Sequence, residues 1–260
     1  MSVKDDLVVV KDNQILNASY RLSLIEQRIV LGCIARVNST EELSKNDGFT
    51  VTISELQDLT MSGKKGLTSM YTEAKKAVER LYARSITLGD DGTKMRWVYA
   101  VKYNDSEGSI SLSFSPSIIP YLSQLKGSFT KYKLEYVANF TSSHSIRIYE
   151  LLVQWSSKGE REVEISELRE MLQLEGRYQR PDNLIARVIK PAIEDINNHS
   201  NLLVTFGTRR TGRRVTHLQF KFDVKQEQKK ITLEQFVRDN PTLTKGKSTP
   251  EVMKLMRDRG

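Results

Sequence analysis

The sequence predicts an α+β fold in which one winged-helix unit is used twice. The tetrapeptide Ile-Ser-Glu-Leu occurs at Ile53–Leu56 and again at Ile165–Leu168, about 110 residues further along the chain. Each copy follows a short β-type run and precedes a longer helical pattern with a related string, Ala77–Leu81 in the first and Ala192–Ile196 in the second. Both copies therefore have the order helix, strand, short helix, longer helix and β-hairpin, which is the order of a winged helix-turn-helix.

The first copy is expected to span residues 1–128, and apolar spacing together with turn residues defines its elements. An arm with a short strand at Leu7–Val10 comes first. Its helices are expected at Tyr20–Val37, at Glu55–Leu59 with Ser54 as N-cap, at Leu67–Arg84, and from Ser115 to about Leu125. Its further strands are expected at Phe49–Ile53, Ser85–Leu88, Met95–Tyr103 and Ser109–Phe114, with a hairpin turn at Gly89–Gly92.

The second copy is expected to span residues 129–224. Its helices are expected at Ser142–Trp155, at Glu167–Leu172 with Ser166 as cap, and at Asn183–Asn197 with Asp182 as cap. Its strands are expected at Glu162–Ile165, Leu202–Phe206 and Val215–Phe222. Pro191 lies inside the longest of these helices and has no backbone N–H, so it predicts a kink or an irregular turn there.

Residues 225–260 form a polar tail. Two amphipathic pieces, Leu233–Arg238 and Pro250–Arg257, are too short to be stable helices on their own. We expect the tail to be disordered, and the alternative is a segment that binds a partner.

The composition favours a polyanionic partner. The 260 residues carry a formal net charge of +8 and the pI is about 9.4, which favours nucleic acid before an acidic membrane surface. The single cysteine, Cys33, excludes an intramolecular disulfide framework and a cysteine-based zinc site. The N-terminus lacks the apolar region of a signal peptide, and no apolar run approaches about 18 residues, so we expect a cytoplasmic protein without a membrane span.

Four arginines crowd the tip of the second expected hairpin: Arg209, Arg210, Arg213 and Arg214. Their mutual repulsion costs stability unless an anion neutralises them, and a duplex backbone does so through charge-assisted hydrogen bonds. We expect a loop at Gly207–Arg214, flexible because a glycine lies towards each end. The alternative is a solvated basic loop without a partner.

The helix that begins at Asn183 is the natural recognition helix, because the N-terminal part of this helix enters the major groove in helix-turn-helix proteins. Arg180, Asn183 and Arg187 are the expected base readers, since Arg pairs with guanine and Asn with adenine. Lys190 lies on the same outer face. The alternative is an exposed polar helix face without a ligand.

The first copy has cations around its equivalent helix that suit phosphate contact more than base discrimination. These are Lys64, Lys65, Lys75, Lys76 and Arg80. We therefore predict that the first copy is the weaker DNA reader, and contact with another protein through its sheet is a comparable alternative.

The motifs of catalytic and cofactor sites are missing from the sequence. The three histidines, His144, His199 and His217, share no pairing motif. A phosphate-binding GxxxxGK[ST] loop and a GxSxG nucleophile motif are also missing. We therefore expect no cofactor, no metal ion and no enzymatic activity.

Four segments resemble the iteron-binding plasmid replication initiators. Ser19–Ile29 is similar to the opening of these proteins, and Phe129–Tyr132 to the segment before their second domain. Ser145–Leu152 resembles the first helix of that domain, and Val188–Asn197 resembles its recognition helix. The resemblance covers about residues 7–224.

This resemblance implies two winged-helix domains related by a pseudo-twofold axis. It implies that monomers bind directly repeated iterons at a plasmid origin, and that dimers formed through the first domain bind an inverted repeat and repress the protein's own gene. It also implies recruitment of the host initiator and the replicative helicase. By position, the major-groove helix is Asn183–Asn197 and the wing is Gly207–Arg214.

The sequence leaves two alternative functions open. A winged-helix transcriptional repressor would bind only an inverted repeat as a stable dimer. A nicking initiator enzyme would use a tyrosine nucleophile and a divalent metal, and its His-hydrophobe-His metal motif is missing here.

Overall fold

The structure is a computed structural model that describes residues 7–44, 48–58, 66–89, 91–225, 236–238 and 240–257. Residues 1–225 form one compact unit and residues 226–260 form a second. Among the described residues, no helix is both long enough and apolar enough to cross a membrane.

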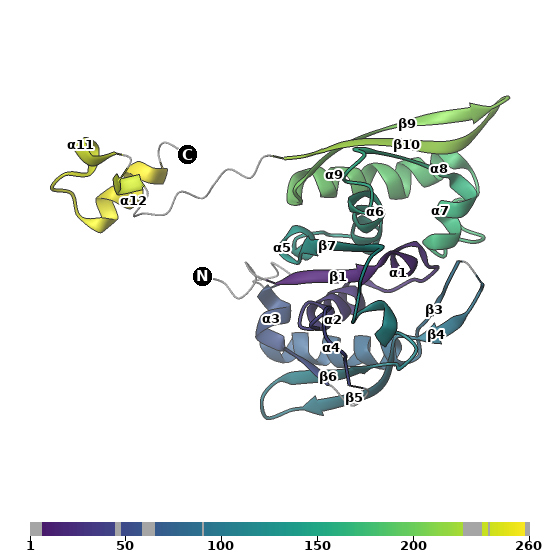
Figure 1. The fold of residues 1–260 in the computed structure, drawn as a ribbon, viewed down its shortest axis with the longest axis horizontal. Coiled ribbons are helices and arrows are strands. Elements are labelled where there is room, and N and C mark those ends of the chain that lie inside the picture. Colours follow the sequence, from purple (N-terminus) through teal and green to yellow (C-terminus); the bar gives the residue numbers. More distant parts are fainter. Residues whose placement is uncertain are drawn as a thin grey trace. The chain divides into compact units, whose positions relative to one another are not determined.

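The first winged helix packs three helices against a three-stranded antiparallel sheet (Figure 1). Its elements are α2 (Leu24–Ile34), β2 (Phe49–Thr52), α3 (Ile53–Asp58), α4 (Leu67–Tyr82), β5 (Val98–Asn104) and β6 (Ser109–Phe114). The strand order is β2-β6-β5. α4 forms because its apolar residues recur at helical spacing, and the stripe Met70, Ala74, Ala77, Val78 and Leu81 is buried.

The second winged helix repeats this arrangement. Its elements are α6 (Ser143–Val153), β8 (Glu160–Glu164), α7 (Ile165–Met171), α8 (Pro181–Leu184), the π-helical turn η2 (Ile185–Ile189), α9 (Lys190–His199), β9 (Leu202–Thr211) and β10 (Arg214–Val224). The strand order is β8-β10-β9, so the last strand of the unit lies in the centre, as in the first sheet. The two copies of Ile-Ser-Glu-Leu begin α3 and α7, and the predicted repeat is confirmed.

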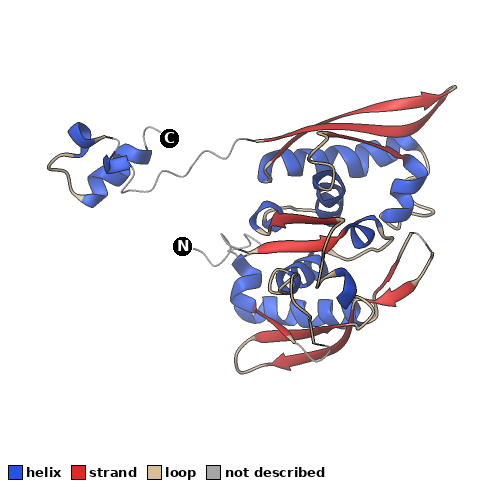
Figure 2. Ribbon diagram, in the orientation of Figure 1, coloured by secondary structure: helices blue, strands red, loops and turns tan. Residues whose placement is uncertain are grey.

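The remaining elements connect the two winged helices. They are β1 (Val8–Asp12), α1 (Asn13–Asn17), the hairpin β3 (Ser85–Thr87) and β4 (Lys94–Arg96), the 3₁₀ turn η1 (Ile119–Tyr121), β7 (Phe129–Lys133) and α5 (Glu135–Ala138). β1 and β7 pair antiparallel, with Val8 opposite Lys133, and lie between the two winged helices (Figure 2). The expected boundary at residue 128 therefore falls just before a strand that pairs with the N-terminal strand.

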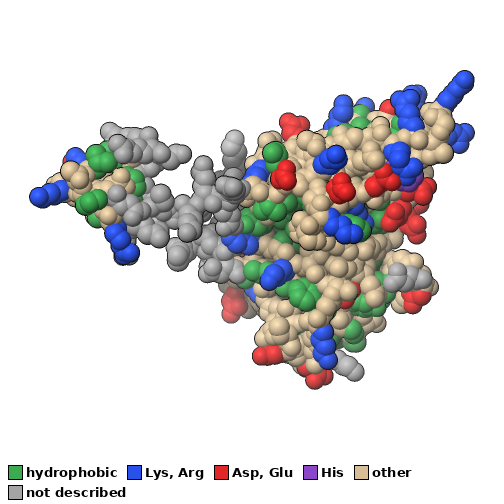
Figure 3. All heavy atoms as spheres, turned by 45° about the horizontal axis from the view of Figure 1, so that its top comes forward, with side chains coloured by type: hydrophobic (Ala, Val, Ile, Leu, Met, Phe, Trp, Pro, Cys, Tyr) green, Lys and Arg blue, Asp and Glu red, His purple; other side chains and the backbone are tan. Residues whose placement is uncertain are grey.

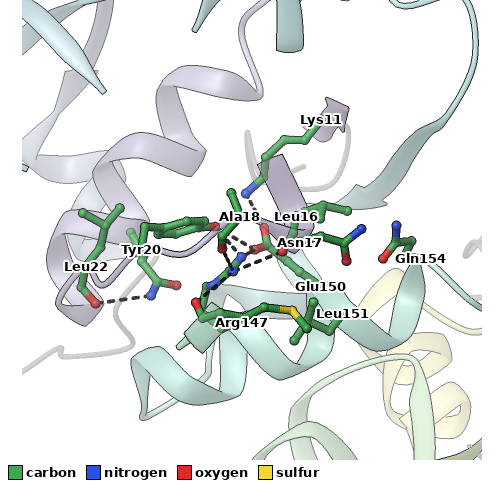
Figure 4. A network of polar contacts seen from close by, with 12 residues as sticks. Lys11, Leu16, Asn17, Ala18, Tyr20, Leu22, Arg147, Glu150, Leu151 and Gln154 are labelled. Atoms are coloured by element: carbon green, nitrogen blue, oxygen red, sulfur yellow. Dashed lines mark hydrogen bonds and ion pairs between the residues drawn. The ribbon is translucent and has the colours of Figure 1, made fainter. Parts of the chain in front are cut away.

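A buried polar network joins β1 and β7 to α6, and Figure 4 shows its residues Lys11, Arg147 and Glu150. The Glu150 carboxylate forms an ion pair with Lys11, accepts a hydrogen bond from Tyr132 Oη at 2.6 Å, and lies 3.3 Å from Arg147 Nη1. The side chains of Lys11, Arg147 and Glu150 are at most 2% exposed. Burial by itself would raise the pKa of Glu150, but Lys11 and Arg147 hold that pKa below its ordinary value.

Arg147 extends this network to the chain between α1 and α2. Its Nη2 donates to the carbonyl oxygens of Leu16 at 3.1 Å and Ala18 at 2.9 Å, and its Nη1 donates to Tyr20 Oη at 2.6 Å. The guanidinium also lies 3.7 Å from the centroid of the Tyr20 ring. Because these partners lie more than 100 residues away in the chain, the network holds the N-terminal segment on the second half.

The two expected N-caps Ser54 and Ser166 were wrong, since both serines lie inside their helices. In the first copy Thr52 takes the role: its Oγ1 accepts from the Glu55 N–H at 3.2 Å, and the Glu55 carboxylate accepts from the Thr52 N–H at 2.8 Å. This reciprocal pair satisfies two free N–H groups at the helix start.

The expected helix from Ser115 to Leu125 was also wrong, because only the short turn η1 forms there. Pro120 lies within that turn. Its ring lacks an N–H and clashes with the carbonyl four residues earlier, so an α-helix cannot continue through it.

The tail was expected to be disordered, but its described residues contain α11 (Pro241–Thr244) and α12 (Thr249–Arg257). Phe236, Thr244 and Val252 are buried. Burial of this kind stabilises helices that are too short to form alone. Residues 233–235 of the first amphipathic piece lie outside the described residues.

Candidate nucleic-acid interface

The expected recognition helix runs from Pro181 to His199 as α8, η2 and α9. Pro181 occupies the first helical position and Arg180 the N-cap position, so Asp182, the expected cap, lies in the first turn. One side of the helix is buried through Leu184, Val188, Ile189, Ala192, Ile193 and Ile196. Asn183, Arg187 and Lys190 are exposed. The three helical residues expected to contact DNA are therefore all free to meet a ligand.

The middle of this helix is irregular, as Pro191 predicted. In the π-helical turn the N–H of Lys190 donates to the carbonyl oxygen of Ile185, five residues earlier. The wider turn moves the carbonyl group of Arg187 away from the ring of Pro191. In a regular α-helix, the proline ring would clash with this carbonyl four residues earlier. Arg187 lies within this turn, and single π-turns are frequent at functional sites.

A residue that sequence reasoning missed, Arg169, anchors the turn before the recognition helix. Its Nη2 donates to the carbonyl oxygens of Tyr178 at 2.5 Å and Gln179 at 2.6 Å. Tyr178 has φ of 48°, which is strained for a residue with a side chain. Arg169 thus ties α7 to the start of α8. Its partners are backbone carbonyls, which every residue has, so no sequence signal could have identified them.

Arg180 lies just before the helix and forms an ion pair with Asp182 at 2.6 Å. Both side chains are mostly exposed, at 76% and 66%. An exposed pair of this kind is weak, so Arg180 can exchange Asp182 for a nucleic-acid partner.

The second hairpin differs from the expected flexible loop at Gly207–Arg214. β9 continues to Thr211 and β10 begins at Arg214, so Gly212 and Arg213 alone form the turn. Gly207 is paired within the ladder, opposite Gln219. Gly212 has φ of 60°, which glycine adopts without strain in a two-residue hairpin turn. We call the hairpin β9–β10 the wing, and it projects beyond the helices (Figure 1).

The strand geometry places Arg209 and its neighbour Arg210 in different surroundings. Successive side chains of a strand point to opposite faces, so Arg209 and Arg210 lie on different faces of the wing. Arg209 is held by Glu162 of β8, with Nη2–Oε1 at 2.8 Å and Nε–Oε2 at 3.1 Å. Arg210, Arg213 and Arg214 are exposed, and each lacks an ion pair with any residue that the structure describes. Lys and Arg side chains gather at the projecting end of the wing, and Asp and Glu side chains lie beside it (Figure 3).

Two of the three cations of α4 form ion pairs with acidic side chains of the same domain. Lys75 pairs with Asp105 at 2.5 Å and lies over the rings of Tyr71 and Tyr103. Arg80 pairs with the fully buried carboxylate of Glu26 at 3.1 Å. Lys76 is exposed and forms no ion pair within the described part of the chain.

Lys64 and Lys65 lie outside the described residues. Of the described cations expected on this helix, Lys75 and Arg80 are therefore neutralised by carboxylates of their own domain.

His144, in the first turn of α6, makes the stability of this region depend on pH. Burial lowers its pKa, and Arg21 and Arg177 lower it further. The unfolded chain therefore binds a proton near the ordinary histidine pKa of about 6.5, while the folded protein does so only at lower pH. We expect the wild type to lose stability as pH falls from 7 to 5, and His144→Gln to lose less. Urea unfolding at both pH values measures this, and equal losses would contradict it.

The structure brings no group of three or more His, Cys, Asp or Glu side chains into metal-binding geometry within its described residues. The exposed recognition helix and the arginine-tipped wing define instead a DNA-binding protein with two winged-helix domains. Two family models match the chain: "Initiator Replication protein, WH1" over residues 8–153 and "Initiator Rep protein, WH2" over residues 164–222. The chain belongs to this family of replication initiators. α6 lies within the first match, although the sequence placed it in the second copy.

Relatives agree with this assignment, and a solved structure has the same fold. A replication initiation protein of Escherichia coli is 30% identical over 236 residues, which cover 87% of this chain and 73% of that relative. The PI protein of Escherichia coli is 24% identical over 266 residues, covering 88% of this chain and 86% of that protein. The crystal structure of Pi initiator protein in complex with iteron DNA matches with a TM-score of 0.74 and 24% identity, over 86% of this chain and 100% of that chain.

Proposed function

We propose that this protein binds the iterons of a plasmid origin as a monomer and thereby starts replication. The observation that carries the proposal is the exposed row Asn183, Arg187 and Lys190 beside a wing with three exposed arginines that form no ion pair with any described residue. The Pi initiator, which shares this fold, was crystallised with iteron DNA, and this supports the same ligand here.

In this proposal the second domain supplies sequence recognition. Asn183, Arg187 and Arg180, at the N-terminal end of the helix, meet base edges in the major groove. Arg210, Arg213 and Arg214 meet phosphates and set the register without reading sequence. The first domain contacts the same duplex about one helical turn away, through Lys64, Lys65 and Lys76.

The further steps belong to the same proposal. Dimers formed through the first domain bind an inverted repeat and repress the protein's own gene. Iteron-bound monomers recruit the host initiator and the replicative helicase in the bacterial cytoplasm. The protein itself acts without catalysis, because its work is to position DNA and partners.

A mobility-shift titration tests the proposal directly. The probes are a tandem-repeat array from the plasmid, an inverted repeat from upstream of the gene, and random duplex, each at two salt concentrations. Stepwise occupancy of the tandem repeats that persists at the higher salt supports an initiator. Binding to the inverted repeat alone would instead indicate a repressor, and equal binding to all three probes would refute sequence-specific recognition.

Removal of Arg187 is expected to relax specificity. A bidentate contact to a base contributes about 1–3 kcal/mol of discrimination, so Arg187→Ala should lose about 5- to 100-fold on iteron DNA and much less on random duplex. The helix should persist because Arg187 is exposed and alanine favours helices. Titration of both probes measures the ratio. Equal losses on both probes would show that Arg187 contacts only the backbone.

A further inference from the structure

The carboxylate of Glu162 occupies the Nε–Nη2 edge of the Arg209 guanidinium. Arg209 Nη2 lies 2.8 Å from Oε1, and Nε lies 3.1 Å from both carboxylate oxygens. Two N–H groups of the guanidinium thus donate to one carboxylate. Arginine binds phosphate with the same bidentate geometry. While this pair is formed, the Nε–Nη2 fork of Arg209 is occupied and its charge is offset by the Glu162 carboxylate.

The pair is built into the sheet and does not arise from neighbouring residues in the sequence. Glu162 lies on β8 opposite Gln219 of the central strand β10, and Arg209 lies on β9 opposite His217. The contact therefore spans the whole three-stranded sheet. Gln219 Nε2 donates to Glu162 Oε2 at 2.8 Å and orients the carboxylate towards Arg209. The hydrogen bond from Arg209 lowers the pKa of Glu162, which keeps the carboxylate charged.

Stability of the fold does not require this pair. Arg209 and Glu162 are 43% and 40% exposed, and ion pairs of such exposure contribute little to folding. The pair does affect charge, because it neutralises one of the four wing arginines and leaves the other three without an ion partner among the described residues.

We propose that Glu162 restrains Arg209 and so limits the sequence-independent affinity of the wing for DNA. Glu162 is then a positioning residue: it keeps Arg209 on the outer face of the sheet and out of the phosphate contacts. This inference rests on the proposed function, since it requires that the wing contact DNA. Sequence-independent contacts strengthen binding to every competing duplex, so fewer of them favour the correct site.

The test is a double-mutant cycle with Glu162→Gln, Arg209→Ala and the double variant, measured on random duplex across a salt series. Glutamine keeps the size of Glu162 but releases the guanidinium. Glu162→Gln should bind random duplex about 2- to 5-fold tighter, and its slope of log K against log salt should steepen by about 0.9, the value for one more phosphate contact. The double variant should lose this gain, and Arg209→Ala alone should bind like the wild type.

Glu160→Gln is the matched control, because Glu160 lies on the same strand and faces the same side, and it has no ion partner among the described residues. It removes one negative charge near the wing without releasing Arg209. Equal gains for Glu160→Gln and Glu162→Gln would overturn the proposal, as would a loss for Arg209→Ala as large as that for Arg210→Ala. If the wing does not contact DNA at all, Arg210→Ala will also bind like the wild type, which separates failure of the proposed function from failure of this inference.

Discussion

Glu150→Gln is expected to destabilise residues 1–225 by about 3–5 kcal/mol, the usual cost of removing one partner from a buried charge network. Glu150 is the single acidic side chain in contact with both Lys11 and Arg147 among the described residues. Burial lowers the pKa of Lys11, so Lys11 can release its proton when Glu150 is neutral. Arg147 cannot do so and would remain charged and buried without its carboxylate partner. Urea unfolding of both proteins measures the difference in free energy.

The exposed Glu160→Gln is the control, and its effect should stay within about 0.5 kcal/mol. If Glu150→Gln does not fold, Tyr132→Phe tests the same network by removing one hydrogen bond to the carboxylate, at a cost of about 1.5–3 kcal/mol. A loss below about 1 kcal/mol for Glu150→Gln would show that the junction does not depend on this charge.

The destabilisation caused by Glu150→Gln should also depend on pH. The pKa of Glu150 is below its ordinary value in the folded protein, so its contribution to stability is present above the unfolded pKa of about 4.3 and is lost as pH falls through the folded pKa. The difference in unfolding free energy between wild type and Glu150→Gln should therefore shrink in acid. A constant difference down to about pH 2 would contradict the ion pair.

The second large effect is expected from the wing. Replacing Arg210, Arg213 and Arg214 together by alanine should reduce the slope of log K against log salt by about 2.7, since each lost phosphate contact accounts for about 0.9. Affinity for iteron and random DNA should fall by similar factors, because phosphates carry no sequence. Arg187→Ala, in contrast, should lower affinity for iteron DNA much more than affinity for random DNA.

The matched control replaces three other exposed cations, Lys102, Lys126 and Lys131, which lie outside the recognition helix and the wing. It causes the same change in net charge, so a general electrostatic effect would appear in both variants. An unchanged salt slope in the arginine variant would show that the wing does not contact the phosphate backbone.

Local patterns in the sequence predicted the architecture. The repeated Ile-Ser-Glu-Leu identified two units, and the structure places it at the start of α3 and of α7 in two sheets of the same strand order. The apolar stripe of α4 and the irregular turn before Pro191 were also predicted. These features depend on residues within about one helical turn, or on a pattern that repeats, and both are visible along the chain.

The partners of the charged residues could not be predicted in this way. Arg80 is paired with Glu26, Lys75 with Asp105, and Arg209 with Glu162, across separations of 30 to 54 residues in the chain. Four arginines in one short segment looked equivalent. Strand alternation places Arg210 on the other face from Arg209, and the register of β8, β9 and β10 brings Glu162 to Arg209 alone among the four.

The sequence by itself determined the repeated winged-helix fold, the long helix from Pro181 to His199 and the basic character of the wing. Only the tertiary structure decided which of these cations are paired with carboxylates of the same protein, and it revealed the buried network around Glu150 that holds the two halves together. The physical reason is that helical and strand periodicity depends on near neighbours, whereas a charge is neutralised by whichever opposite charge folding brings within a few ångströms.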